Sequence, residues 1–189
     1  MKKRKISIST IILIIVFLVG LSVMLYPAVS DYWNSKTQSH AIAEYDEILN
    51  NMDDKQYQKL LSDYNERLKS LYSPLENYSE IEGYENALDV TGTGIMGYVT
   101  IPEISVELPI YHGTSDEVLN VAVGHVQGST LPIGGKSTHS VISAHRGLPS
   151  AKLFSDLDEL SEGDIFTLTV LNNVLTYEVD KILIVEPEE

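Results

Sequence analysis

Hydrophobic residues follow three successive patterns along this chain, and the first is an unbroken apolar run. Residues 11–26 carry no charged side chain and only Gly20 and Ser22 as mild interruptions. A run of this length is long enough to cross a bilayer as a helix. The basic segment Met1–Lys5 precedes it, and basic residues accumulate on the cytoplasmic side of membrane-spanning helices. We therefore predict a single-pass membrane anchor within residues 1–30, with a cytoplasmic N-terminus.

A cleaved signal peptide is the alternative for the same segment. Ala28-Val29-Ser30 is similar to the small-residue sites at which signal peptides are cut. The apolar run is longer than a usual signal-peptide core of about 7–15 residues, which favours the uncleaved anchor. Under both interpretations the rest of the chain is extracellular.

The second pattern is helical and lies in residues 31–90, a predicted helical extension and connector. Apolar side chains recur every three or four positions in two sets: Ile42, Tyr45, Ile48, Leu49 and Met52, then Tyr57, Leu60, Leu61, Tyr64, Leu68 and Leu71. This spacing predicts two amphipathic helices with a break at residues 51–54. A continuous coiled coil is the alternative, but the two segments cover too few heptads to favour it. We expect both helices to pack their apolar faces on the following domain.

The third pattern has the two-residue period of β-strands and defines a predicted domain over residues 91–189. Five segments fit it: Gly97–Ile101, Val106–Tyr111, Ser140–Ala144, Ile165–Leu171 and Leu175–Val185. Asn172-Asn173 predicts a two-residue hairpin turn, because asparagine tolerates the positive φ that such turns need. Residues 150–160 predict a short helix or a helical turn. Together these segments predict a mainly β, mostly antiparallel domain in the form of a barrel.

Charge and cysteine content narrow the possible functions. After Pro27 the chain has 27 acidic residues and nine lysines and arginines, a formal charge of −18. Such a charge argues against a nucleic acid partner. The sequence has no cysteine, so the exported part must be stable without disulfides.

Histidines and carboxylates are the residue types that could bind a metal ion here, but neither type has the sequence spacing of known metal ligands. His112, His125 and His139 lack the close spacing of zinc ligands, and a structural role is predicted for them. The acidic cluster within residues 156–162 lacks the regular ligand spacing of a calcium loop. We expect no metal and no cofactor.

A succession of short motifs resembles that of the sortases. The motifs are Gly97–Pro102, Leu108–Thr114, Gly124-His125, Leu131–Gly135, Ser143–Gly147, Leu153-Phe154 and Gly163-Asp164. Several independent motifs in one order make the resemblance specific, although none of them would be so alone. It extends from about Met96 to the last residue and is strongest with the class C, pilin-polymerising branch, whose anchor and helices this chain also resembles.

The resemblance implies a membrane-anchored cysteine transpeptidase of a Gram-positive cell surface. Such enzymes cleave an LPxTG-like sorting signal between Thr and Gly, form a thioacyl-enzyme and pass the acyl group to an amine. In the pilin branch the amine belongs to a lysine of the next pilin. The chemistry needs a thiolate, a histidine and an arginine. Of these three only the histidine can be placed, as His145, which a predicted strand delivers to a loop.

The sequence departs from the family pattern at several points. It contains no Thr-Leu-x-Thr-Cys motif, and Arg146 does not match the family's catalytic arginine. Ser73-Pro74-Leu75 stands where pilin sortases usually carry an Asp-Pro-aromatic lid. We therefore expect a C-terminally truncated sortase with an incomplete barrel, inactive by itself and marginally stable. The alternatives are a non-catalytic remnant that binds substrate or a partner, and a housekeeping sortase that anchors surface proteins to a cell-wall precursor.

Overall fold

The long apolar run folds into the start of a single helix, α1 (Ile8–Leu49), in a computed structural model that describes residues 7–52 and 55–186. The basic flank at residues 1–5 and the acidic pair Asp53-Asp54 lie outside the described residues, as do the side chains of residues 55–58. The predicted anchor and the predicted first amphipathic helix are joined in α1. The reason is local, because residues 28–48 contain no glycine or proline that would interrupt helical hydrogen bonding.

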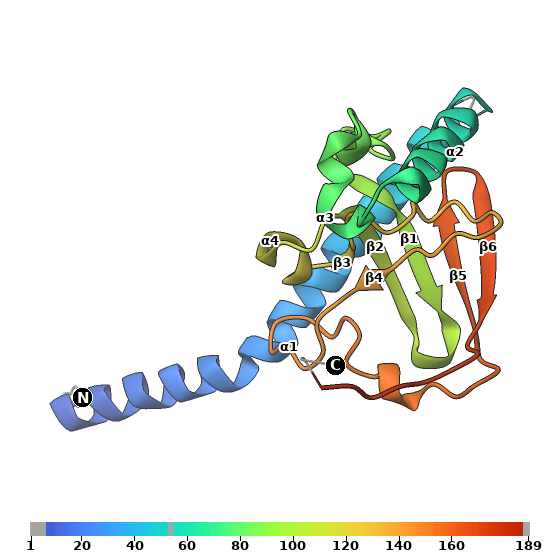
Figure 1. The fold of residues 1–189 in the computed structure, drawn as a ribbon. Helices are drawn as coiled ribbons and strands as arrows, with labels where there is room; N and C mark the ends of the chain where they lie inside the picture. Colours follow the sequence, from blue (N-terminus) through green and yellow to red (C-terminus); the bar gives the residue numbers. More distant parts are fainter. Residues whose placement is uncertain (1–6, 53–54, 187–189) are drawn as a thin grey trace.

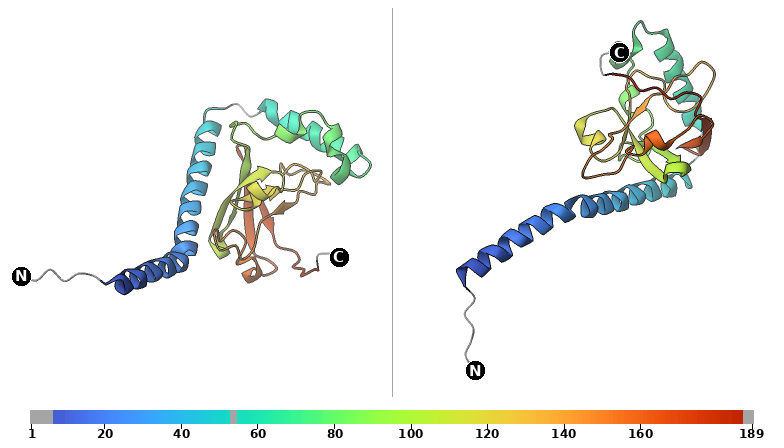
Figure 2. Two further views of the ribbon diagram at one scale, coloured as in Figure 1. Left: turned by 90° about the vertical axis from the view of Figure 1, so that its left-hand side faces the viewer. Right: turned by 90° about the horizontal axis from the view of Figure 1, so that it is seen from below.

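The N-terminal part of α1 has the properties of a membrane span. Its most apolar 18-residue window has a mean hydropathy of 2.9 and buries nothing against the described protein. The aromatic residues Tyr26, Tyr32 and Trp33 follow with exposed fractions of 58–71%. Tyrosine and tryptophan gather where a bilayer meets water, so this part of α1 has the composition of a membrane interface. The helix changes direction part-way along its length (Figure 2), and Pro27 within it lacks the N–H that a straight helix would use.

The second amphipathic pattern forms α2 (Lys55–Ser70), which packs on the domain as expected. Its buried residues are Leu61, Tyr64, Asn65 and Leu68. Leu60 is 46% exposed, so the buried face is narrower than the predicted one. The Asn65 amide donates to the carbonyl oxygen of Leu131 and accepts from the Leu131 N–H, at 3.2 and 2.7 Å. These two hydrogen bonds to the backbone of one residue hold α2 against the loop that contains Leu131.

The remaining helices are single turns in the connections. They are α3 (Pro74–Asn77), η1 (Tyr78–Glu80), η2 (Tyr84–Asn86), η3 (Pro102–Ile104), α4 (Asp116–Leu119) and η4 (Leu157–Glu159). The predicted helical turn within residues 150–160 corresponds to η4.

Within the described residues, six strands form one sheet in the order β4-β3-β2-β1-β5-β6 (Figure 1). They are β1 (Ile95–Ile101), β2 (Val106–His112), β3 (Val123–His125), β4 (Ile142–Ser143), β5 (Ile165–Val170) and β6 (Asn173–Glu178). Only β2 and β3 pair in parallel, and the other neighbours are antiparallel. The mainly β, mostly antiparallel prediction is confirmed.

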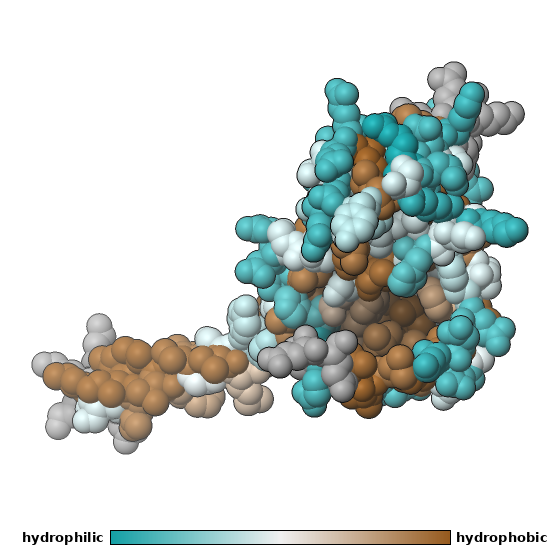
Figure 3. Space-filling model, in the orientation of Figure 1, coloured by the Kyte–Doolittle hydropathy of each residue, from teal (hydrophilic) through white to brown (hydrophobic). Residues whose placement is uncertain are grey.

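The sheet is a curled half-barrel, because the first and last strands in its order do not pair with each other. Figure 3 shows an apolar hollow on the face of the domain seen in that view, with hydrophilic residues on its right and further apolar residues below it. The prediction of an incomplete β-barrel is confirmed.

The structure corrects three details of the predicted strands. The short strand β3 was not predicted as a strand. The turn between β5 and β6 consists of Leu171 and Asn172, because Val170 pairs with Asn173, and its positive φ of 52° falls on Leu171. The last strand ends at Glu178 and not at Val185. Glu178 pairs with Ile165, the first residue of β5, so the following residues have no strand beside them.

Tyr45 connects α1 to two distant parts of this sheet. Its ring is fully buried, and its hydroxyl donates to the Met96 carbonyl at 3.0 Å and accepts from the Leu171 N–H at 2.9 Å. Met96 is the extra residue of a β-bulge in β1, which turns its carbonyl away from β2. Burial raises the pKa of Tyr45 to about 12, so the hydroxyl stays protonated and able to donate.

We expect Tyr45→Phe to lower the free energy of unfolding by about 1–3 kcal/mol, because it leaves a buried carbonyl and a buried N–H without a partner. Thermal and urea unfolding of the detergent-solubilised chain would measure this loss. Tyr72→Phe is the matched control, because Tyr72 is 90% exposed. Equal stability of the two variants would contradict the role of the Tyr45 hydroxyl.

Candidate functional site

His145 lies in the loop directly after β4. Ser143 pairs with Gly124 and Ile142 with His125, so β3 sets the place at which the chain leaves the sheet. The prediction that a strand delivers His145 to a loop is confirmed, although β4 is shorter than the predicted Ser140–Ala144. The Val141 N–H donates to a side chain, Ser129 Oγ, at 3.1 Å. Strand β4 therefore begins only at Ile142.

A backbone contact determines which ring nitrogen of His145 carries the proton. Nδ1 lies 2.8 Å from the carbonyl oxygen of Leu119, at the end of α4. A carbonyl oxygen can only accept a hydrogen bond, so Nδ1 must be the donor. The neutral ring then has an unprotonated Nε2, which makes no hydrogen bond among the described residues. The side chain is half-buried, and the lone pair of Nε2 is available as a hydrogen-bond acceptor.

The loop that carries His145 is attached to the segment that follows it. The Phe154 N–H donates to the His145 carbonyl at 3.2 Å, and the Gly147 N–H donates to Ser155 Oγ at 3.0 Å. Arg146 pairs with Asp158 at 2.7 Å and holds the pKa of that carboxyl below its usual range. The guanidinium is therefore engaged in joining two loops at the surface.

Two other histidines form a neutral pair inside the domain. Parallel pairing of β2 and β3 sets His112 beside His125, with ring centroids 5.4 Å apart. His125 Nε2 lies 3.0 Å from the Thr130 carbonyl and 3.1 Å from Ser129 Oγ. Burial lowers the pKa of both rings, that of His112 to about 4. A charged imidazole would be costly here, so this arrangement agrees with the predicted structural role.

The described residues contain no group of three histidine, aspartate or glutamate side chains that could hold a metal ion. In the acidic cluster, Asp156 pairs with Lys152 and Asp158 with Arg146. His139 lies at the surface, and its backbone is bonded to Thr130, with the Thr130 N–H donating to the His139 carbonyl at 3.0 Å.

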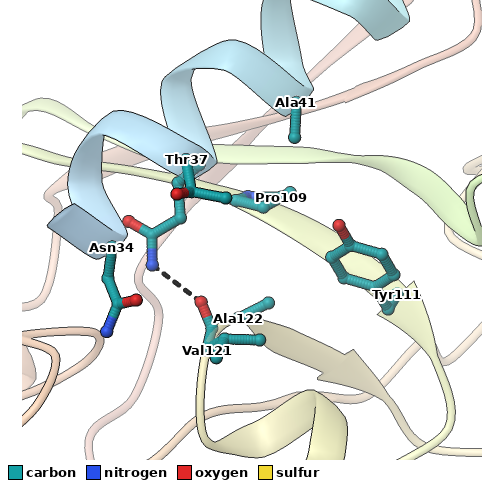
Figure 4. Close-up of a pocket in the computed structure, with 8 residues that line it drawn as sticks. Asn34, Thr37, Ala41, Pro109, Tyr111, Val121 and Ala122 are labelled. Atoms are coloured by element: carbon teal, nitrogen blue, oxygen red, sulfur yellow. Dashed lines mark hydrogen bonds between the residues drawn. The ribbon is translucent and has the colours of Figure 1, made fainter.

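A small cavity opens between α1 and the turn that contacts His145 (Figure 4). Asn34, Thr37, Gln38 and Ala41 line it from α1, and Pro109, Tyr111, Val121 and Ala122 line it from the domain. The turn at residues 119–122 therefore faces the cavity with two side chains and supplies the carbonyl that binds His145. No hydrophobic pattern predicts this contact, because residues 31–40 contain few apolar side chains.

The known proteins that this chain resembles all belong to one family. A model of the sortase domain matches residues 99–189. Sortase D of Bacillus subtilis is 34% identical over 93 residues, which are 49% of this chain and 44% of that protein. The chain thus matches less than half the length of this curated relative.

Solved structures match over a larger share of the chain. Sortase C1 of Streptococcus agalactiae is 43% identical with a TM-score of 0.70, and the match covers 79% of this chain and 80% of that one. Sortase C of Streptococcus pneumoniae is 42% identical with a TM-score of 0.69, and the match covers 79% and 78% of the two chains. The matched region therefore includes helices that precede the sheet as well as the sheet itself.

We expect the stability of the chain to fall as the pH decreases from about 6.5 to about 4. Because the pKa of His112 is lowered to about 4 in the folded state, the unfolded state binds a proton first in this window. The stabilisation is complete above about pH 6.5, the ordinary pKa of histidine, and is lost as the pH approaches the folded value. Urea unfolding at a series of pH values would measure this slope.

His112→Phe should make that slope shallower, because phenylalanine does not titrate, while the contribution of His125, whose pKa is also lowered, remains. His139→Gln, at an exposed position, is the control and should keep the slope of the unchanged chain. An unchanged slope in the His112→Phe variant would show that the lowered pKa of His112 does not cause the pH dependence of stability.

Proposed function

This chain belongs to the sortase family, and on this basis we propose that His145 is the general acid and base of a class C sortase-type transpeptidation. The observation that carries the proposal is the contact between His145 Nδ1 and the Leu119 carbonyl. It leaves Nε2 as the one ring nitrogen available for proton transfer. The sheet and the class C structural neighbours support the same reaction.

The proposed reaction moves one proton in each direction through His145 Nε2. A thiolate attacks the threonine carbonyl of the sorting signal, the bond from threonine to glycine breaks, and the imidazolium protonates the departing amine. The neutral Nε2 then removes a proton from the incoming amine as it attacks the thioester and releases the thiolate. Since residues 1–189 include no cysteine, the thiol has to be supplied from outside them.

The proposed substrates are pilins or other surface proteins with an LPxTG-like sorting signal. The sortase C of Streptococcus pneumoniae is described as having pilin substrate specificity, which supports a pilin lysine as the acceptor amine. The apolar part of α1 supports a membrane location for this chain. In this arrangement the N-terminus is cytoplasmic and the β domain is extracellular.

A binding role is the second candidate function, and the absence of cysteine favours it. The chain would then hold a sorting signal or a partner beside His145 without cleaving it. The two functions differ in their products, because only transpeptidation releases the glycine fragment.

We expect the purified chain to release no product from an LPxTG-type peptide, because removing the nucleophile of such a site abolishes most of the rate. Mass spectrometry of the peptide with and without an added amine would test this expectation. The sortase C1 of Streptococcus agalactiae is the positive control under the same conditions. Cleavage between threonine and glycine that is lost in His145→Ala would overturn it.

We also expect the same peptide to shift the ring resonances of His145 in NMR spectra of the detergent-solubilised chain. Both candidate functions require the sorting signal to lie beside that ring. A peptide of the same composition in scrambled order is the control and should cause no shift. If the two peptides have the same effect at saturating concentration, the proposed substrate class is wrong.

A further inference from the structure

One face of α1 contacts the loops around His145 before the same face enters the core. Asp31, Asn34 and Gln38 are half-buried, whereas the residues between them are exposed. Their spacing of three and four places them in one stripe. The stripe continues into Ile42 and Tyr45, which are buried against the sheet. The polar part of the stripe thus begins among the exposed aromatic residues of α1, because Asp31 directly precedes Tyr32 and Trp33.

The first two residues of the stripe bind the segment after the His145 loop. The Asn34 amide donates to the Ser150 carbonyl at 2.8 Å, and the Lys152 N–H donates to the Asp31 carboxylate at 2.7 Å. Phe154, two residues later, donates its N–H to the carbonyl of His145 itself. A path of three hydrogen bonds and a short stretch of chain therefore joins α1 to the His145 backbone.

The third residue binds the turn that orients the ring. The Gln38 amide donates to the Val121 carbonyl at 2.7 Å, which is the dashed contact in Figure 4. Val121 follows Leu119 by two residues, and the Leu119 carbonyl accepts from His145 Nδ1. The ring and the backbone of His145 are thus connected to the same helix through two separate loops.

We propose that Asp31, Asn34 and Gln38 are positioning residues that hold His145 in the geometry its proton transfer needs. Loops with few buried contacts open easily, whereas a packed helix does not. Attaching both loops to α1 keeps the Leu119 carbonyl opposite Nδ1 and keeps Nε2 free. Catalytic groups depend on such supporting contacts for their orientation. The inference rests on the proposed role of His145, since positioning has a purpose only if the ring reacts.

The three positioning residues lie close behind the apolar part of α1. The three positioning residues span about 11 Å of helix, at about 1.5 Å per residue. They start directly after the apolar part of α1, with Trp33 among them at 71% exposure.

The test replaces two donors by side chains of similar length that cannot donate. In Asn34→Leu, the amide of Phe154 should exchange with solvent about tenfold faster, as expected for one lost hydrogen bond in a loop. In Gln38→Met, ¹⁵N NMR of the histidine rings should show a smaller fraction of the Nδ1–H tautomer of His145. Ser39→Ala is the matched control, because its hydroxyl bonds only to Ser35 within α1.

Exchange of the Val99 amide in the centre of β1 serves as the internal reference. Faster exchange at Phe154 with unchanged exchange at Val99 supports positioning, because a general loss of stability would accelerate both. If the double variant Asn34→Leu, Gln38→Met keeps the tautomer and the Phe154 exchange rate of the unchanged chain, the proposal is overturned. Parallel acceleration at Phe154 and Val99 with an unchanged tautomer overturns it as well.

The peptide experiment separates this inference from the proposed function. Loss of His145 geometry in the variants, together with no response of His145 to the sorting-signal peptide, would refute the function and leave the positioning contacts established. If His145 responds to the peptide but its geometry is unchanged in the Asn34 and Gln38 variants, the positioning proposal is refuted and the proposed function is supported.

Discussion

The hydroxyl of Tyr45 is the contact on which the arrangement of this molecule depends. It joins α1 to the bulge of β1 and to the turn between β5 and β6, elements that are distant in the chain. Because α1 is continuous from Ile8 to Leu49, fixing its C-terminal part on the sheet also fixes the direction of the part before it. The polar residues two to four turns earlier then lie beside the loops of the site. A packing contact in the core thereby determines which residues of α1 lie beside the loops around His145.

The two environments of histidine in the domain follow from strand pairing. The parallel pair β2 and β3 places His112 and His125 in the interior, where burial keeps both rings neutral. The antiparallel pair β3 and β4 ends two residues before His145 and releases it into a loop. There the ring meets one backbone carbonyl and keeps a free nitrogen. The same side chain is thus enclosed in the interior or placed in a surface loop according to the strand pairing around it.

The sequence predicted the elements whose signal is local. The helical period of residues 57–71 led to α2, and the two-residue period led to β1, β2 and β5. The errors occur where a partner decides the outcome. The chain after Glu178 has a strand-like composition, but its pairing with β5 ends there, whereas Val123–His125 becomes a strand because β2 and β4 lie on either side of it. The turn shifted to Leu171 because its N–H is bound by Tyr45.

By itself the sequence determined the apolar span, the family motifs, the position of His145 and the absence of a thiol. These are properties of composition and local order, and they need no knowledge of contacts. Only the tertiary structure decided which nitrogen of His145 is free, and that Asp31, Asn34 and Gln38 contact the loops around it. The physical reason is that their partners are backbone atoms 26 to 121 residues away. A backbone carbonyl or N–H is present in nearly every residue, so no pattern of side chains marks the one that will be used.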